Sequence, residues 1–174
     1  MHKLQIILLA TTLTGFVSPS ISHSEDSGYF FDCDVPPSRV SMWHGAIDST
    51  AGLEISGTIQ VLDVRHDERW LPVGSVFLLN SEQRKVGLQF FFNWKEPHML
   101  QVALYAGDRK TFASLPMPDS PIPFVLSVTA SGDMTATVDN KSETVRLDAF
   151  DARRIELSCS SGEFKFEGVL VTSD

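Results

Sequence analysis

The sequence predicts an all-β fold in which two antiparallel sheets pack face to face as a β-sandwich. Through most of residues 123–171 the side chains alternate with a period of two, and the alternation breaks only at residues that favour turns. No long segment after residue 22 has the apolar spacing of a helix. About ten strand-like segments lie between turn-forming residues, which is typical of a two-sheet sandwich.

The second half of the chain contains the most regular strands. Apolar residues recur at every second position in 124–130, a turn follows at 131–133, and the same spacing returns in 134–138 and 145–147. Because successive side chains of a strand point to opposite faces, each segment is expected to bury one face. The last segment, 155–171, continues the pattern.

The first half continues the pattern of strands. Expected strands occupy residues 53–65, 73–80, 85–94 and 99–107, and Gly, Pro and polar clusters separate them. Short helical turns are expected only near 38–42 and 149–153. The chain shows no repeats and no shift in composition that would mark a linker, so we expect one domain.

Residues 1–22 have the layout of a secretory signal peptide, with one lysine, an apolar stretch over 4–17 and then small residues. Ser20 and Ser22 have the spacing of a cleavage site, which predicts a cut after Ser22, with Ser24 as the neighbouring option. The apolar stretch is too short to span a bilayer comfortably, and the alternative is a buried N-terminal strand. We expect a signal peptide over 1–22, a single domain over 23–174 and a periplasmic or secreted protein with no membrane insertion.

The charge disfavours nucleic acids and anionic membranes as partners. The chain has 14 Lys and Arg against 22 Asp and Glu, for a net charge of −8. Removing residues 1–22 takes away Lys3 and no acid, which leaves a net charge of −9. Nucleic acids and anionic membranes need a basic surface, so we expect neither as a partner.

Both cysteines, Cys33 and Cys159, lie in the part predicted to be exported. An oxidising compartment favours a disulfide between them, and their wide spacing argues against a redox motif or a zinc site. Cys159 shares its strand face with Ile155 and Leu157, which places it toward the core. We therefore expect a structural disulfide.

The order of segments resembles that of the concanavalin A-like lectin and glucanase superfamily, which includes laminin G-like domains. The resemblance rests on GTIQVLDVR, GSVFLLN, GLQFFFN, FVLSVTASGDMTATVDN and IELSCSSGEFKFEGVLV, and it covers nearly all of the chain after the leader. It implies a jelly-roll sandwich in which the last strand returns beside the first. It implies little about activity, because one fold hosts many functions.

Catalytic motifs are not found. The glucanases of this superfamily carry Glu-x-Asp-x-x-Glu or a close variant on one strand, and this chain has no such string. Its nearest acidic cluster, residues 63–68, is interpreted as a solvated strand end, and the common hydrolase and phosphate-binding motifs are absent from the sequence. We expect no enzyme activity, and the minor alternative is a hydrolase or lyase without the usual carboxylate motif.

Metal ligands are not spaced for a site. His44, His66 and His98 form no pair at a ligand spacing, so we expect no metal and no cofactor. Calcium is the alternative, because relatives in the superfamily often carry it and the expected loops contain Asp108, Asp119, Asp133, Asp139 and Asn140. Aspartate in a loop is more often a turn former.

A glycan-binding surface on one sheet face is the leading functional prediction. If Leu88 and Val102 face the core, their alternate neighbours face outward. Amides hydrogen-bond to sugar hydroxyls, and aromatic rings cover the apolar face of a pyranose. The predicted ligand-binding residues are Gln60, Gln89, Phe91, Asn93, Trp94, Gln101 and Tyr105. The competing interpretation is an ordinary solvated face, with the tryptophans as structural anchors.

The alternative function is a protein-interaction module that binds no sugar, such as an inhibitor, an immunity protein or an envelope assembly factor. Acidic side chains expected on the outer surface would then meet a basic envelope or extracellular protein: Glu143, Glu156, Glu163 and Glu167. Scattered surface charge normally serves only solubility.

Overall fold

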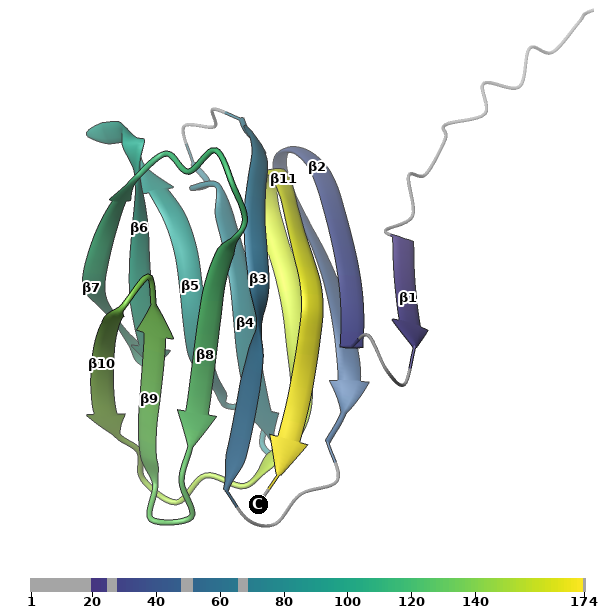
Figure 1. Cartoon of the computed structure of the whole chain (residues 1–174), viewed down its shortest axis with the longest axis vertical. Helices are drawn as coiled ribbons and strands as arrows, with labels where there is room; N and C mark the ends of the chain where they lie inside the picture. Colours follow the sequence, from purple (N-terminus) through teal and green to yellow (C-terminus); the bar gives the residue numbers. More distant parts are fainter. Residues whose placement is uncertain (1–19, 25–27, 48–51, 66–68, 174) are drawn as a thin grey trace, which may run out of the picture.

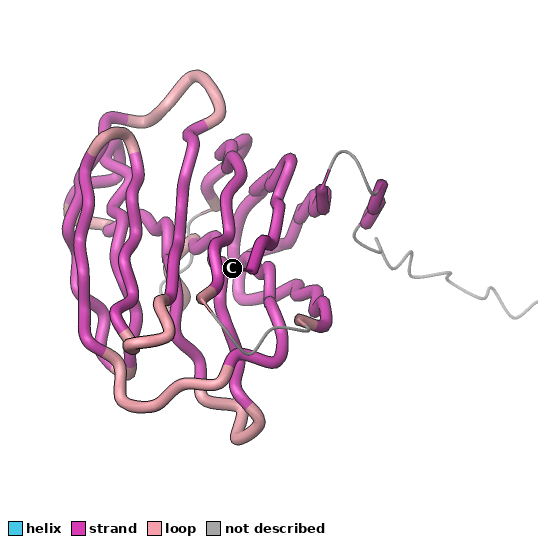
Figure 2. The backbone as a smooth tube through the Cα atoms, turned by 60° about the horizontal axis from the view of Figure 1, so that its bottom comes forward, coloured by secondary structure: helices cyan, strands magenta, loops and turns pink. Residues whose placement is uncertain are grey.

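The computed structural model describes residues 20–24, 28–47, 52–65 and 69–173. Every regular element in these residues is a strand, which confirms the predicted all-β class (Figures 1 and 2). The strands are β1 (Ser20–Ser24), β2 (Gly28–Ala46), β3 (Leu53–Val64), β4 (Val73–Asn80), β5 (Lys85–Asn93), β6 (Glu96–Ala106), β7 (Asp108–Pro116), β8 (Ile122–Val128), β9 (Asp133–Val138), β10 (Lys141–Arg146) and β11 (Ala152–Ser173).

The strands form one antiparallel sheet that folds over on itself into two layers. The order is β10-β9-β8-β3-β11-β4-β5-β6-β7, with β2 on the other side of β11 and β1 beside β2. Figure 1 shows β10, β9, β8 and β3 in front, which we call the front layer, and β4 to β7 behind, which we call the back layer. The predicted two-sheet antiparallel jelly-roll sandwich is therefore confirmed.

β2 and β11 join the two layers because each bends and continues from one into the other. Residues 152–160 of β11 pair with β4, whereas residues 162–173 pair with β3. At the change, Ser161 has φ +49°, Ser38 on β2 has φ +58°, and the N–H of Ser38 donates to Oγ of Ser161 at 3.2 Å. A Cβ on Gly162 would lie 2.7 Å from the carbonyl oxygen of Asp63, so the tight approach at this bend needs glycine.

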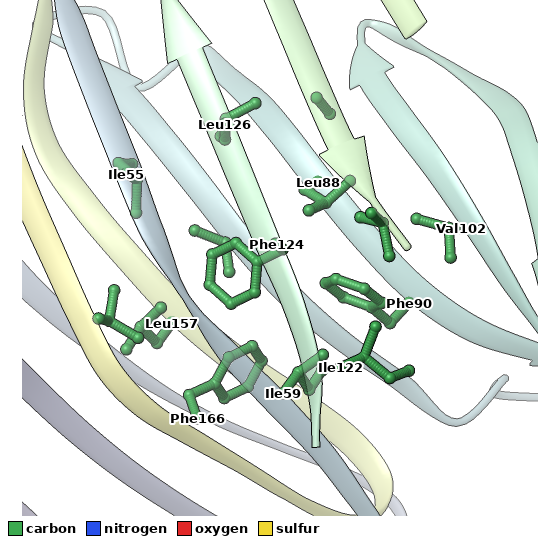
Figure 3. Packing of buried hydrophobic residues seen from close by; sticks show 14 of the residues in the cluster. Ile55, Ile59, Leu88, Phe90, Val102, Ile122, Phe124, Leu126, Leu157 and Phe166 are labelled. Atoms are coloured by element: carbon green, nitrogen blue, oxygen red, sulfur yellow. The ribbon is translucent and has the colours of Figure 1, made fainter. Parts of the chain in front are cut away.

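The core fills the space between the layers. Figure 3 shows Phe90 of β5 facing Phe124 of β8, and their ring centroids are 6.0 Å apart in an edge-to-face arrangement. Side chains such as these, at 0–1% exposure, each stabilise the fold by about 1.5–3 kcal/mol through burial. The core residues alternate along their strands as the sequence pattern predicted.

The predicted disulfide between Cys33 and Cys159 is confirmed, and both cysteines are buried. Their Cα atoms are 6.3 Å apart. Cys33 is opposite Phe164, in the part of β11 that belongs to the front layer. Cys159 is opposite Gly74 of β4, in the back layer. The bond therefore joins the two layers close to the bend.

On the opposite side of the sandwich, side chains link β7 with β10. Nζ of Lys110 donates to Oε1 of Glu143 at 2.7 Å, and Nζ of Lys141 donates to the carbonyl oxygen of Ser114 at 3.4 Å. The two outer strands are not joined by a backbone ladder. Charged side chains complete the closure instead.

Three details differ from the sequence prediction. The helical turn expected at 38–42 is wrong, because these residues lie within β2 at its bend. The one expected at 149–153 is also wrong, because it covers a loop and the first residues of β11. β7 was not predicted, since Phe112 is an extra residue between the pairs Val102–Ala113 and Ala103–Thr111 and this bulge breaks the alternation.

Most of the predicted signal peptide, residues 1–19, lies outside the described residues. Its last residues belong to β1, which pairs with residues 28–32 of β2, so the predicted cut after Ser22 falls within β1. The domain boundary remains a prediction. No helix long and apolar enough to cross a membrane occurs in the described ranges.

Candidate functional site

Four of the predicted ligand-binding residues share the outer face of the back layer, turned away from the core. Gln89 and Phe91 alternate with the core residues of β5, and Gln101 and Tyr105 alternate with those of β6. The side chains of Gln89 and Gln101 are only 8% exposed, because longer side chains from neighbouring strands contact them. The predicted face exists, but its amides are less open to solvent than expected.

The strand register aligns this surface into three rows that run across β2, β11, β4, β5, β6 and β7. We call it the six-strand face. The first row is His44, Glu156, Phe77, Gly87, Tyr105 and Arg109; the middle row is Met42, Ser158, Ser75, Gln89, Ala103 and Thr111; the third row is Val40, Ser160, Val73, Phe91, Gln101 and Ser114. The middle row is small or polar at most positions, whereas the first row carries most of the charge.

Glu156 is a buried carboxylate at the β11 position of the first row, with 2% of its side chain exposed. Nζ of Lys85 donates to its two oxygens at 2.7 and 2.8 Å, and Oγ of Ser158 donates at 3.3 Å. Nε2 of His44 lies 2.9 Å from Oε2. A buried carboxylate is tolerated only when it is paired in this way.

Arg109 lies at the β7 end of the first row and reaches back over β5. Its Nε donates to Oε1 of Gln89 at 2.8 Å, and its guanidinium carbon lies 4.4 Å from the ring centroid of Phe91. Loss of water contact lowers the pKa of Arg109, with a smaller opposing effect from Tyr105. These contacts hold the guanidinium over the Phe91 ring.

Phe77 and Tyr105 meet across Gly87, which lies between them in the first row. Their ring centroids are 5.6 Å apart, edge to face. A Cβ on Gly87 would lie 2.2 Å from the carbonyl oxygen of Val76 and 3.0 Å from the Phe77 ring. The missing side chain therefore lets β4 and the two rings approach each other.

Gln101 is fixed by two acceptors in the third row. Its Nε2 donates to Oε2 of Glu96 at 3.0 Å and to Oγ of Ser114 at 2.9 Å. The amide nitrogen is therefore occupied. Among the described residues, no hydrogen bond engages its side-chain carbonyl oxygen.

The structure does not bring the other predicted residues into these rows. Gln60 is a correction: it is on β3 opposite Lys165, on the outer face of the front layer, because β3 pairs with β8 and the second half of β11. Asn93 is exposed at the end of β5, where its side chain accepts the N–H of Lys95. Trp94 is half-buried in the β5–β6 turn.

Apolar side chains are exposed where β2 borders the face. Val40 is 42% exposed and Met42 is 50% exposed. Ser160, opposite Val40, donates through Oγ to the carbonyl oxygen of Leu71 at 2.9 Å, which brings the segment of Trp70, 43% exposed, to this end of the face. Trp43, by contrast, packs against the core as an anchor.

Sequence reasoning missed the role of the charged residues. Glu156 was expected to be a solvated surface charge, and this is wrong because Lys85 and His44 enclose it. Its alternation with Ile155 and Leu157 placed it on the outer face but gave no sign of its partners. Arg109 was missed together with β7.

No group of three metal-ligating side chains gathers in the described part of the chain. Of the acids considered for calcium, Asp133 instead accepts hydrogen bonds from Arg146 at 2.8 Å and Ser131 at 3.1 Å, and the Arg146 bond lowers the pKa of Asp133. A pocket of about 380 Å³ lies at the end of the sandwich, between the β8–β9 turn and the segment before β11, away from every predicted ligand-binding residue.

Comparison with known proteins identifies the fold. No protein-family model and no curated protein matches the chain. Among solved structures, an alginate lyase from Pseudomonas aeruginosa is similar at TM-score 0.60 and 15% identity, covering 91% of this chain and 88% of that one. The carbohydrate-binding module CBM66 from Bacillus subtilis is similar at TM-score 0.53 and 12% identity, covering 90% of this chain and 93% of the module. The PL7 alginate lyase AlyA1 from Zobellia galactanivorans is similar at TM-score 0.53 and 15% identity, covering 94% and 86%.

The chain thus has a concanavalin A-like jelly-roll fold, and the resemblance seen in its sequence is confirmed. The expectation that it is not an enzyme is corrected by the same comparison. Alginate lyases, which are enzymes, share the fold over nearly the whole chain. The fold itself is therefore no argument against catalysis.

Proposed function

We propose that the chain binds a glycan on the six-strand face. The observation that carries the proposal is the alignment in rows of polar side chains from six adjacent strands, some of which, such as Gln89 and Gln101, are held by a partner on a neighbouring strand. Strands are about 4.8 Å apart, so six of them offer a path of about 24 Å before curvature, long enough for several sugar units. We expect a linear glycan to lie along the middle row.

The chemistry of the rows suits sugar hydroxyls, which both donate and accept hydrogen bonds. Ser75 and Ser158, which are 4% and 7% exposed, supply hydroxyls at the floor of the middle row, and Gln89 supplies an amide there. The exposed Met42 and Trp70 near the β2 border offer apolar contact for the nonpolar faces of sugar rings. Side chains that are already fixed lose little entropy on binding.

The fold supports the proposal, since a carbohydrate-binding module and alginate lyases share it. The disulfide supports export to the periplasm or the outside of the cell, because such bonds persist in oxidising compartments. A glycan outside the cytoplasm is the ligand that fits both.

Affinity electrophoresis and calorimetry against a panel of soluble polysaccharides test the proposal. We expect one or more to bind, and Gln89→Ala and Tyr105→Ala to weaken binding by about tenfold, the equivalent of 1.4 kcal/mol. Gln60→Ala is the matched control, because it removes the same amide from the front layer. Equal affinities of Gln89→Ala and Gln60→Ala would contradict the proposal, and so would elution of one stoichiometric protein partner in place of a sugar.

Cleavage of the bound glycan is a second candidate, favoured by His44 and Glu156. The buried carboxylate holds Nε2 of His44 and leaves the other ring nitrogen with no hydrogen-bond partner among the described residues. A carboxylate that orients an imidazole in this way is a known arrangement for a general base. Product formation from the same panel, followed by reducing ends and by absorbance of unsaturated sugars, should be lost in His44→Gln and kept in His98→Gln.

A further inference from the structure

Arg109 differs from the neighbouring cation Lys85 in the chemistry of its partners. Lys85 is neutralised by Glu156, with which it makes two hydrogen bonds. Arg109 contacts the amide oxygen of Gln89 and the ring of Phe91, and both partners are neutral. Among the residues that the structure describes, no carboxylate lies within ion-pair distance of Arg109.

The terminal N–H groups of Arg109 remain available to a ligand, and we call them its fork. A guanidinium has five N–H donors in one plane, and the contacts within the chain use only the one on Nε. The guanidinium carbon lies over the Phe91 ring and Nε is bound to Gln89, so these two contacts restrict the position of the terminal nitrogens. Such a fork binds an anion with little further loss of conformational freedom.

The side chains around this fork are donors as well. Arginine has no acceptor, so the Gln89 oxygen must face Arg109, and the Gln89 amide nitrogen is left as a donor with no partner in the described ranges. The phenol of Tyr105 lies on the strand position directly opposite Arg109. Arg109 is exposed on β7, yet partial loss of water contact lowers its pKa, and no carboxylate among the described residues opposes this effect.

We propose that the glycan bound on the six-strand face is acidic and that Arg109 binds one of its carboxylates through the two terminal guanidinium nitrogens. This inference rests on the proposed function and names the ligand class. A carboxylate has two oxygens in the geometry of the fork, so two parallel hydrogen bonds form. Because the chain has a net charge of −8, long-range attraction does not draw polyanions to it, and selectivity depends on this local contact.

The test compares polygalacturonate and alginate with their methyl-esterified forms, which keep the sugar backbone and lose the charge. We expect an acidic polymer to bind at least about tenfold more tightly than its ester. Arg109→Gln should remove that difference, because it weakens binding of the acidic polymer much more than binding of the ester. Arg109→Lys should recover only part of it, because lysine keeps the charge without the fork.

Arg146→Gln is the matched control, since it removes the same charge from an arginine on β10 that pairs with Asp133. Thermal melting of each variant checks that it is folded. Ester binding as tight as acid binding, or equal effects of Arg109→Gln and Arg146→Gln, would overturn the inference while glycan binding itself still stands. Tighter binding of dextran sulfate than of either uronate polymer would overturn the carboxylate assignment, and no binding to any polymer, charged or neutral, would overturn the proposed function as well.

Discussion

Nζ of Lys85 on β5 lies 2.7 and 2.8 Å from the two carboxylate oxygens of Glu156 on β11, and β4 runs between these strands. The pair therefore bridges three strands of the back layer. The charged side chain of Glu156 is almost fully buried, with 2% of it exposed. Loss of this ion pair would therefore change the charge at one end of the six-strand face.

Lys85→Met should destabilise the fold by about 1–3 kcal/mol, because it leaves a buried carboxylate with a weaker partner. Lys85→Met combined with Glu156→Gln should recover most of that loss, since the unpaired charge is then removed. Urea unfolding at neutral pH measures both. Arg146→Met, which breaks an exposed pair, should change stability much less, and additive effects in the double variant would contradict this account.

Removal of the disulfide should lower stability by up to about 4–5 kcal/mol, because the disulfide constrains a long loop in the unfolded chain. The bond joins residues 126 apart in the sequence. The measurement is guanidinium unfolding of the double variant Cys33→Ala, Cys159→Ala, compared with the native chain before and after reduction. Reduction should leave the stability of the double variant unaltered; a native chain that is equally stable with and without reductant would refute the prediction.

The link between Lys110 and Glu143 should weaken in acid. The hydrogen bond from Lys110 lowers the pKa of Glu143 from its ordinary value of 4.5. A carboxyl whose pKa is lowered by folding stabilises the native state above its ordinary pKa, and this contribution disappears as the pH falls through the lowered value. The stability difference between the native chain and Lys110→Met should thus shrink between about pH 6 and pH 3.

Unfolding free energies at a series of pH values test this effect. Lys141→Met serves as the control, because Lys141 contacts a backbone carbonyl and no carboxylate. Its difference from the native chain should not depend on pH in the acidic range. A Lys110→Met difference that is likewise constant with pH would count against the closure by this ion pair.

Gly87→Ala should destabilise the chain by about 1–3 kcal/mol, because the added Cβ overlaps backbone that cannot easily move. The nearest atom, the Val76 carbonyl oxygen, would be 2.2 Å away. It should also separate Phe77 from Tyr105, which near-ultraviolet circular dichroism would detect. Gly107→Ala meets no atom within 4 Å and bears only the strain of φ +89°, so its loss should be smaller. Equal losses in the two variants would show that the contact is not tight.

The sequence predicted whatever depends on local alternation. The outward positions of Gln89 and Tyr105 follow from a period of two within one strand. The partners of Glu156 do not, because they depend on β11 lying between β2 and β4, which no local pattern encodes. Gln60 was grouped with the wrong layer for the same reason, and Arg109 was missed because a bulge at Phe112 hides the strand that carries it.

β2 and β11 run continuously through both layers, so the two layers share these two strands. Neither layer can separate from these strands by itself, because their backbone hydrogen bonds continue into the other layer. Amide hydrogens of β11 on both sides of Gly162 should therefore exchange with solvent in one concerted opening. A ligand held on the back of the molecule would then slow exchange in the front layer as well, by mass action on that single opening.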